Sequence, residues 1–170
     1  RRHVLAFRPE GTVDVTIGYS KVDSNQPPDL TASIVCLGNK INHERFPYPL
    51  QDVTGTIAVD AKAVTFQDIE AAPLLQSDPS LRPSVRVNGR LSLLPDSRGE
   101  GVFTARARDI LFTSQLGESL PKSLQGIYRD SSPRGPFDLD METLEVSGKD
   151  HKLVRLGGRM DLRPCSFHVS

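Results

Sequence analysis

Three carboxylates alternate along one short segment and are the side chains best spaced to do chemistry. Asp138, Asp140 and Glu142 are separated by single apolar residues within residues 137–142. In a β-strand such residues share one face at intervals of about 6.6–7 Å, because each residue advances the chain by roughly 3.3 Å. Two neighbouring carboxyl groups can serve as general acid and base in glycoside hydrolysis, so Asp140 and Glu142 are the candidates for a catalytic pair.

This spacing resembles the Asp-x-Asp-x-Glu strand of the chitinase-like glycosidases, in which the final Glu is the general acid. Those enzymes use an eight-stranded α/β barrel of about 250 residues. The present chain has 170 residues and lacks both the alternating helices and the further Asp that precedes their motif. A solvated strand face opposite Arg155, Arg159 and Arg163 explains the carboxylates without catalysis. We therefore expect no catalytic residues, and a glycosidase-like hydrolase is the third of the functions considered.

Metal and nucleophile chemistry have less support. The metal-ligating residue types lie closest together at Cys165 and His168, at His43 and Glu44, and at Asp150 and His151. A closed zinc site needs four ligands with paired short spacings, and carboxylates on a flat strand do not wrap Ca²⁺. The sequence also has no Gly-x-Ser-x-Gly elbow and no glycine-rich loop that opens a helix. We expect no metal site and no cofactor.

Net charge bears on the partners. The chain has 21 basic and 21 acidic residues, so its formal net charge is zero. This balance removes the long-range attraction toward polyanions, and we expect no nucleic-acid partner. An alternating basic set could bind an anionic head group or a polysaccharide, but such residues more often form an exposed strand face. The set comprises Arg82, Arg86, Arg90, Arg106 and Arg108.

Length and the start of the chain predict the domain organisation. A chain of 170 residues has the length of a single domain, so we expect one β-rich domain over residues 1–170. No apolar run reaches the roughly 18 residues of a membrane span. The start, Arg1-Arg2-His3-Val4, has no initiator Met and no signal peptide, which indicates a segment of a larger protein. Cys36 and Cys165 allow at most one disulfide, and the sequence leaves open whether they are bridged.

Alternation of apolar and polar residues is the dominant pattern and predicts a mainly β, antiparallel fold. It is strongest over residues 12–19, 84–93, 137–146 and 154–162, with weaker strands expected over residues 30–37, 53–59, 63–70 and 101–109. Turn-forming residues separate these strands at 24–29, 46–49, 79–83, 95–99 and 147–150. Such spacing predicts meanders in a strongly curved sheet, either a groove or half-barrel or a sandwich-like arrangement.

The last two strands make a specific hairpin. Its register places Phe137 opposite Leu162, Leu139 opposite Met160, and Asp140 opposite Arg159. Apolar positions change parity after Glu142, which requires a bulge. Val154 is expected on the apolar side of the last strand.

One stretch, residues 113–130, is predicted to be an amphipathic helical segment that packs on the sheet. Its apolar residues recur at helical spacing: Leu116, Leu120, Leu124, Ile127 and Tyr128. Thr113 or Ser114 can cap its start, and a break is expected near residues 117–121. Because one helical segment covers only part of a sheet, the rest of the core needs a curled sheet, a second sheet or another part of the protein.

A weak internal repeat relates residues 9–15 to residues 133–139. Both segments have the pattern Pro-x-Gly-x-apolar-Asp-apolar at the entry of a strand. If the repeat is genuine, each unit is part of an array and cannot close its own core.

Several segments follow the cadence Pro-Leu-x-Asp-Val-x-Gly-x-Ile or parts of it. They are residues 9–14, residues 46–57, residues 64–69 and residues 85–91. This cadence resembles that of the large bacterial envelope proteins of the AsmA and TamB-like superfamily. Members of that superfamily build long grooves of curved β-sheet, are tethered to the inner membrane, project through the periplasm and are implicated in phospholipid movement.

The resemblance implies that the inward apolar positions face lipid. These positions are Val13, Val15, Ile17, Val85, Val87, Leu91 and Leu93. It also implies a periplasmic, membrane-associated location, neighbouring domains of the parent chain as partners, and no enzymatic activity. Our first hypothesis is a β-groove module of a larger envelope protein that binds or conducts lipid or other hydrophobic chains, or scaffolds envelope assembly. The alternative is a self-contained β-sandwich for adhesion or for carbohydrate or protein binding, whose apolar side is an ordinary closed core.

Overall fold

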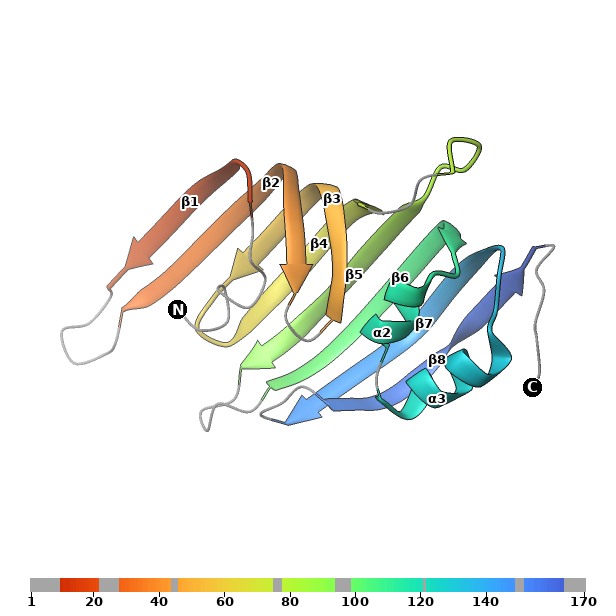
Figure 1. Cartoon of the computed structure of the whole chain (residues 1–170). Helices are drawn as coiled ribbons and strands as arrows, with labels where there is room; N and C mark the ends of the chain where they lie inside the picture. The colour runs from red at the N-terminus through yellow and green to blue at the C-terminus, as the bar shows by residue number, and fades with distance from the viewer. Residues whose placement is uncertain are drawn as a thin grey trace.

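A computed structural model of the chain describes residues 10–21, 28–43, 46–74, 78–93, 99–120, 122–148 and 152–163. Eight strands form one antiparallel sheet, in which each strand pairs with the next along the chain (Figure 1). The strands are β1 (Val13–Ser20), β2 (Asp29–His43), β3 (Phe46–Val59), β4 (Ala63–Pro73), β5 (Ser84–Leu93), β6 (Gly99–Leu111), β7 (Pro136–Gly148) and β8 (Lys152–Leu162). The predicted mainly β, antiparallel fold is confirmed, and the sheet is not closed.

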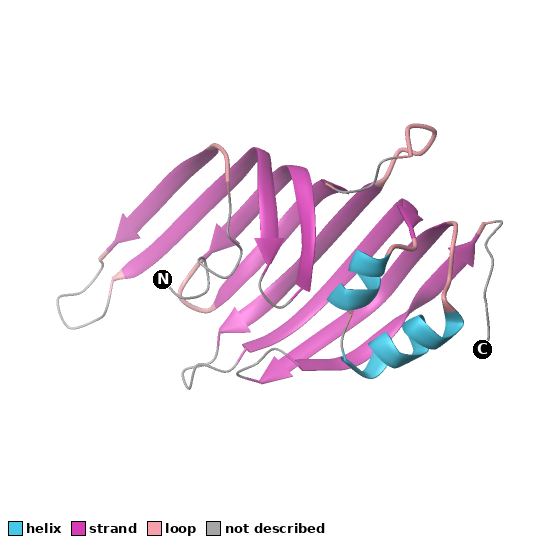
Figure 2. Ribbon diagram, viewed as in Figure 1, coloured by secondary structure: helices cyan, strands magenta, loops and turns pink. Residues whose placement is uncertain are grey.

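Two short helices, α2 (Ser114–Ser119) and α3 (Lys122–Ser131), lie between β6 and β7. They replace the single helical segment predicted over residues 113–130, with the break where it was expected. The Thr113 side chain accepts a hydrogen bond from the Leu116 N–H and so caps α2. Figure 2 shows both helices on the same face of the sheet.

The helix pair is held together through Tyr128. Its ring lies so close to Gly117 that a Cβ there would come within 2.6 Å of the ring. The Tyr128 hydroxyl donates to the Thr113 carbonyl at 2.8 Å, and burial, followed by the neighbouring Tyr48, raises the pKa of Tyr128 to about 12. Leu116 is buried, but Leu124 and Ile127 are exposed. The expectation that all these apolar residues pack on the sheet was therefore wrong for most of α3.

The β7–β8 hairpin has the predicted register. Phe137 pairs with Leu162, Leu139 with Met160, and Asp140 with Arg159. The predicted bulge after Glu142 is present as a register shift between Met141 and Thr143. A second shift in this hairpin places Leu153, and not Val154, opposite Val146, so the assignment of Val154 to the apolar face was wrong.

The second and third strands are longer than predicted, and their connected ends fold over the sheet. Residues 46–49 were predicted to be a turn, but β3 already begins at Phe46 and its ladder with β2 includes Ile41 opposite Leu50. The end of β2 and the start of β3 cross the face that also carries the helices (Figure 1). Tyr48 is buried there, and packing of its ring explains why this proline-containing segment stays extended.

Two small clusters of buried residues form where the apolar face is covered. The first contains Tyr48, Ile110, Leu116 and Phe137, and thus joins β3, β6, α2 and β7. Phe112 stacks on Phe137 with ring centroids 4.4 Å apart. The second contains Cys36, Val53 and Ala71 from β2, β3 and β4. The core therefore lies at one end of the sheet.

Three aspartates form bulges that bend the strands. Asp52, Asp68 and Asp109 have positive φ angles of 54°, 47° and 57°, and each lies at a register shift in β3, β4 or β6. Aspartate tolerates this left-handed conformation better than most residues with a side chain, and an extra residue in one strand increases its local twist. Each aspartate is followed by Val or Ile, whose side chain returns to the apolar face.

A substitution at Asp52 tests the backbone requirement. We expect Asp52→Val to lower the free energy of unfolding by about 1–3 kcal/mol, because a β-branched residue is strained at positive φ. Asp52→Gly should preserve or raise stability, since glycine adopts this conformation freely. Denaturant titration measures both variants, and equal losses would show that the aspartate side chain matters and not the backbone conformation.

Candidate functional site: an open apolar face

The apolar face of the sheet is the candidate site, and the strand register shows how it is assembled. Residues directly opposite each other in neighbouring strands point to the same face of a sheet. Following the pairs from β1 to β8 therefore traces one row on one face. The first row is Val15, Ile34, Ile57, Phe66, Gly89, Phe103, Leu144 and Leu156. Every member is apolar or glycine.

A parallel row lies two residues further along each strand. It runs through Ile17, Ala32, Val59, Val64, Leu91, Gly101, Val146 and Leu153. The two rows together form an uncharged band across all eight strands, which we call the apolar band. With neighbouring strands about 4.8 Å apart, the band is roughly 34 Å long.

Phe103 marks the middle of the apolar band. A Cβ on Gly89 would lie within 2.3 Å of the Phe103 ring, and a Cβ on Gly101 would lie within 2.5 Å of it. The ring therefore rests flat over two glycines, with the Phe66 ring centroid 5.9 Å away. This packing places aromatic carbon along the band without raising a tall side chain above it.

The apolar band is exposed at both ends. In β1, Val15 is 53% exposed and Ile17 is 67% exposed, and in β8, Leu153 and Leu156 are 43% and 52% exposed. Side chains in the middle strands are partly buried by their neighbours, and the covering elements lie over the other end of the strands. The band is thus a surface and not a closed core.

The seven residues predicted to line a groove fall on this face. Val13, Val15 and Ile17 are exposed on β1, and Leu93 is exposed on β5. Val87 and Leu91 are partly buried, and Val85 packs against the buried cluster beneath α2. Val85 therefore has a structural role as well as its predicted place on the face.

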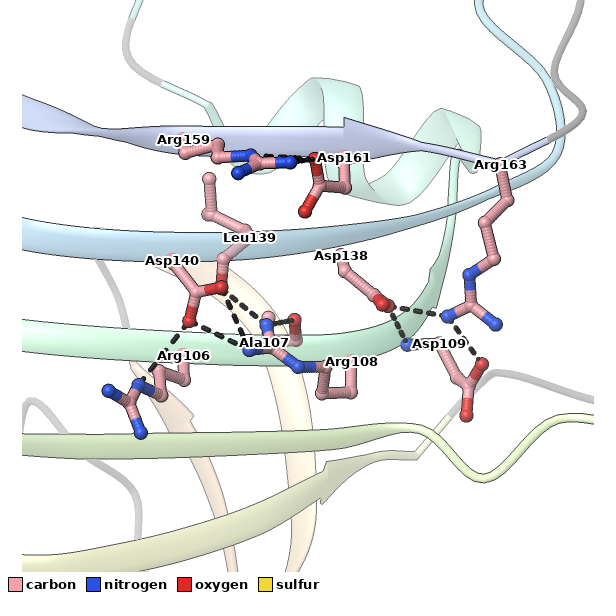
Figure 3. A network of polar contacts seen from close by, with 10 residues as sticks. All are labelled: Arg106, Ala107, Arg108, Asp109, Asp138, Leu139, Asp140, Arg159, Asp161 and Arg163. Carbon is pink, nitrogen blue, oxygen red and sulfur yellow. Dashed lines mark hydrogen bonds and ion pairs between the residues drawn. The ribbon is translucent and has the colours of Figure 1, made fainter.

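The opposite face carries the carboxylates (Figure 3). Arg108 Nη2 contacts both carboxylate oxygens of Asp140 at 2.8 Å, and Arg106 Nε lies 3.3 Å from Asp140 Oδ1. The sequence predicts Arg159 opposite Asp140, and the pairing is confirmed, but the Arg159 side chain bonds to Asp161 instead. Glu142 is exposed and makes no ion pair with a described residue. The candidate catalytic pair is thus one carboxylate held by two arginines beside one in solvent.

Asp138 belongs to a second ion-pair group. The Arg163 guanidinium lies 2.5 Å from Asp138 Oδ1 and 2.6 Å from Asp109 Oδ1. The Asp109 N–H, displaced from the ladder by its bulge, donates to Asp138 Oδ1 at 2.8 Å. Partial burial raises the pKa of Asp138, but the Asp109 N–H and Arg163 outweigh it and hold that pKa below its usual value. The three groups fasten the end of β8 to β6 and β7.

The same device recurs at the Asp68 bulge. Its N–H donates to Asn88 Oδ1 of the next strand at 2.7 Å, as the Asp109 N–H donates to Asp138. The sequence analysis did not identify these bulges. The dipeptide of Asp followed by Val or Ile, which recurs at 52, 68 and 109, was the available signal.

The basic residues of this face are engaged with carboxylates. Arg86 bonds to Glu70, Arg106 and Arg108 bond to Asp140, and Arg155 lies 3.7 Å from Glu145. Opposite charges are therefore matched across strands, and an unpaired basic patch for an anionic ligand does not form from these four arginines.

Metal and membrane features can be assessed only for the described residues. Within them, no group of three or more His, Cys, Asp or Glu side chains could hold a metal ion, and no helix is long and apolar enough to cross a membrane. The side chains of the predicted pairs at 43–44, 150–151 and 165–168 lie outside the described residues, as does Cys165. Cys36 is buried, and burial raises the pKa of its thiol.

Comparison with protein-family models, curated proteins and solved structures found no match to this chain. The interpretation of the site therefore depends on its geometry.

The pH dependence of stability tests the role of Asp138. Because its pKa is lowered in the folded state, its charge stabilises the fold above the ordinary aspartate pKa of about 4, and this contribution is lost as the pH falls through the folded-state pKa. We expect Asp138→Asn to cost about 1 kcal/mol at pH 7 and much less near pH 3. Urea unfolding at both pH values measures this difference. Glu142→Gln on the same strand is the control and should have little effect, and a pH-independent loss for Asp138→Asn would contradict the ion-pair role.

Proposed function

We propose that this chain is a non-enzymatic β-groove module that binds lipid or other long hydrophobic chains along its apolar band. The observation that carries the proposal is the unbroken apolar row from Val15 in β1 to Leu156 in β8, exposed at both ends. Acyl chains need apolar walls and few directional contacts, which is what this surface offers.

The size of the exposed apolar surface supports a ligand. Monomeric soluble proteins seldom expose contiguous apolar patches above a few hundred Å² unless the patch has a function. Here the exposed large apolar residues of β1 and β8 belong to one band joined through the middle strands. The opposite face has alternating charges in ion pairs, so the two faces differ sharply in polarity. A ligand that covers only the apolar face fits this asymmetry.

The arrangement of strands favours a groove over a sandwich. All eight strands belong to one sheet, and no second sheet is present among the described residues. The end of β2, the start of β3 and the two helices cover one end of the apolar face, which leaves a surface with a closed end and an open end. We further propose, from the cadence around residues 46–57, that the chain is part of a larger AsmA and TamB-like protein of the bacterial periplasm.

Co-purification tests lipid binding directly. The chain should be expressed in a bacterial host, purified without detergent and examined by native mass spectrometry, with lipid extraction in parallel. We expect mass additions that match phospholipid or fatty acid. Repeated absence of such additions, together with no uptake of a fluorescent fatty acid, would overturn the proposal.

Charge insertion tests where the ligand lies. Leu156→Lys with Met160→Lys places two charges on exposed positions of the apolar face, so folding should be preserved. We expect fatty-acid affinity to fall by about tenfold or more, equivalent to 1.4 kcal/mol. The matched control is Thr54→Lys with Thr104→Lys, which adds the same charge to exposed positions on the opposite face. Equal losses in both variants would place the ligand elsewhere.

A further inference from the structure

Strand β1 is an edge strand with an open hydrogen-bonding side. It pairs with β2 through eight consecutive residue pairs without a register shift. All eight of its residues are exposed, and its outer side pairs with no described strand (Figure 1). Such an edge presents unpaired N–H and C=O groups that can template pairing with another strand.

The two edges of the sheet differ in their protection. Natural edge strands avoid pairing by means of lysine or arginine, proline, and bulges. The other edge, β8, has Arg155 and Arg159, a central Gly157-Gly158 pair, and two register shifts with β7. In β1 there is no Lys, Arg or Pro, and Asp14 is its only charged residue. The features that would keep a partner strand away are thus present in β8 and missing from β1.

We propose that β1 is a homodimer interface, in which β1 of one copy pairs antiparallel with β1 of a second copy. A two-fold axis perpendicular to the sheet keeps the apolar faces of both copies on the same side. This symmetry requires residues of the same parity to face each other, and the fully overlapped register is centred on Thr16. The inference concerns the strand edge and does not rest on lipid binding.

The centred register pairs complementary side chains. It places Val15 opposite Ile17, Val13 opposite Tyr19, Asp14 opposite Gly18, and Thr16 opposite Thr16 of the second copy. Pairs of β-branched residues, of aromatic with β-branched residues, and of threonine with threonine stabilise antiparallel ladders. The two Asp14 carboxylates each face a glycine and so do not oppose each other. No like charges meet across this interface.

The size of the interface predicts a weak dimer. One edge of eight residues buries well below the roughly 800 Å² per partner of a stable complex, so we expect dissociation in the micromolar range or above. The dimer extends the apolar band across a second copy instead of covering it, because both apolar faces lie on one side.

Charge-swap variants at the dyad test the proposal. Analytical ultracentrifugation of the lipid-free chain over a range of concentrations should show a monomer–dimer equilibrium. Thr16→Lys and Thr16→Glu each place like charges directly opposite each other, and at low salt each should weaken self-association by about fivefold or more. Thr104→Lys, on the same face but in β6, is the matched control and should dimerise normally. Thr16 is exposed, so both variants should fold, which circular dichroism checks.

Mixing the variants separates this interface from other modes of pairing. An equimolar mixture of Thr16→Lys and Thr16→Glu should restore dimers, since the two charges then face each other. A chain that stays monomeric at all concentrations, open-ended polymers from β1–β8 pairing, or a mixture that is not rescued would each overturn the proposal. None of these results bears on fatty-acid uptake, so the two proposals fail independently.

Discussion

The register of one continuous ladder is the constraint on which the rest of this structure depends. Because each strand pairs with the next without a crossover, a side chain's parity in β1 determines the face of its partners as far as β8. The apolar residues of every strand must therefore gather on one face. The chain covers only one end of that face, with α2 and the start of β3, since Leu116 and Tyr48 are the buried side chains these elements contribute. Burial of apolar surface is the dominant stabilising contribution to folding, so a fold that leaves half of this surface open forgoes part of it.

The polar face provides the curvature and the fastening. Each bulge at Asp68 and Asp109 adds a residue to one strand, which twists it, and a side-chain oxygen of the next strand accepts the displaced N–H. A buried or partly buried N–H without a partner would be costly, so Asn88 and Asp138 make the bends affordable in terms of hydrogen bonding. Arg163 then links the Asp109 bulge to the strand that bends against it. Residues that first suggested catalysis are thus better explained as parts of the bent sheet.

Period-two alternation is a local property, so the sequence alone was sufficient to predict the strands and the β7–β8 register. Asp140 opposite Arg159 follows from parity and one turn, and it is correct. The side-chain partner was not predictable, because Arg108 reaches Asp140 from β6, a distant segment. Tyr48 in an apparent turn is a second example: Pro47 and Pro49 indicate a turn locally, but burial of the Tyr48 ring against Ile110 and Phe137 decides the conformation. The exposure of Leu124 and Ile127 likewise depends on where α3 lies and not on its own periodicity. For the site, the residues of the apolar face were identified in advance, whereas their continuity from strand to strand required the full register.

An exposed apolar face and an unprotected edge present different physical problems, and one solution does not replace the other. A second copy at β1 satisfies main-chain N–H and C=O groups, but it lengthens the uncovered apolar band. A ligand with an apolar chain shields side chains such as Val15 and Leu156 but offers no hydrogen bonds to the edge. Pairing and ligand binding are therefore additive: joining two copies doubles the length of a continuous apolar surface, and a longer surface can hold a longer chain or pass one from copy to copy. A sheet with a charged edge at β8 and an uncharged outer edge at β1 would extend in one direction and stop, which favours a closed pair over an open fibre.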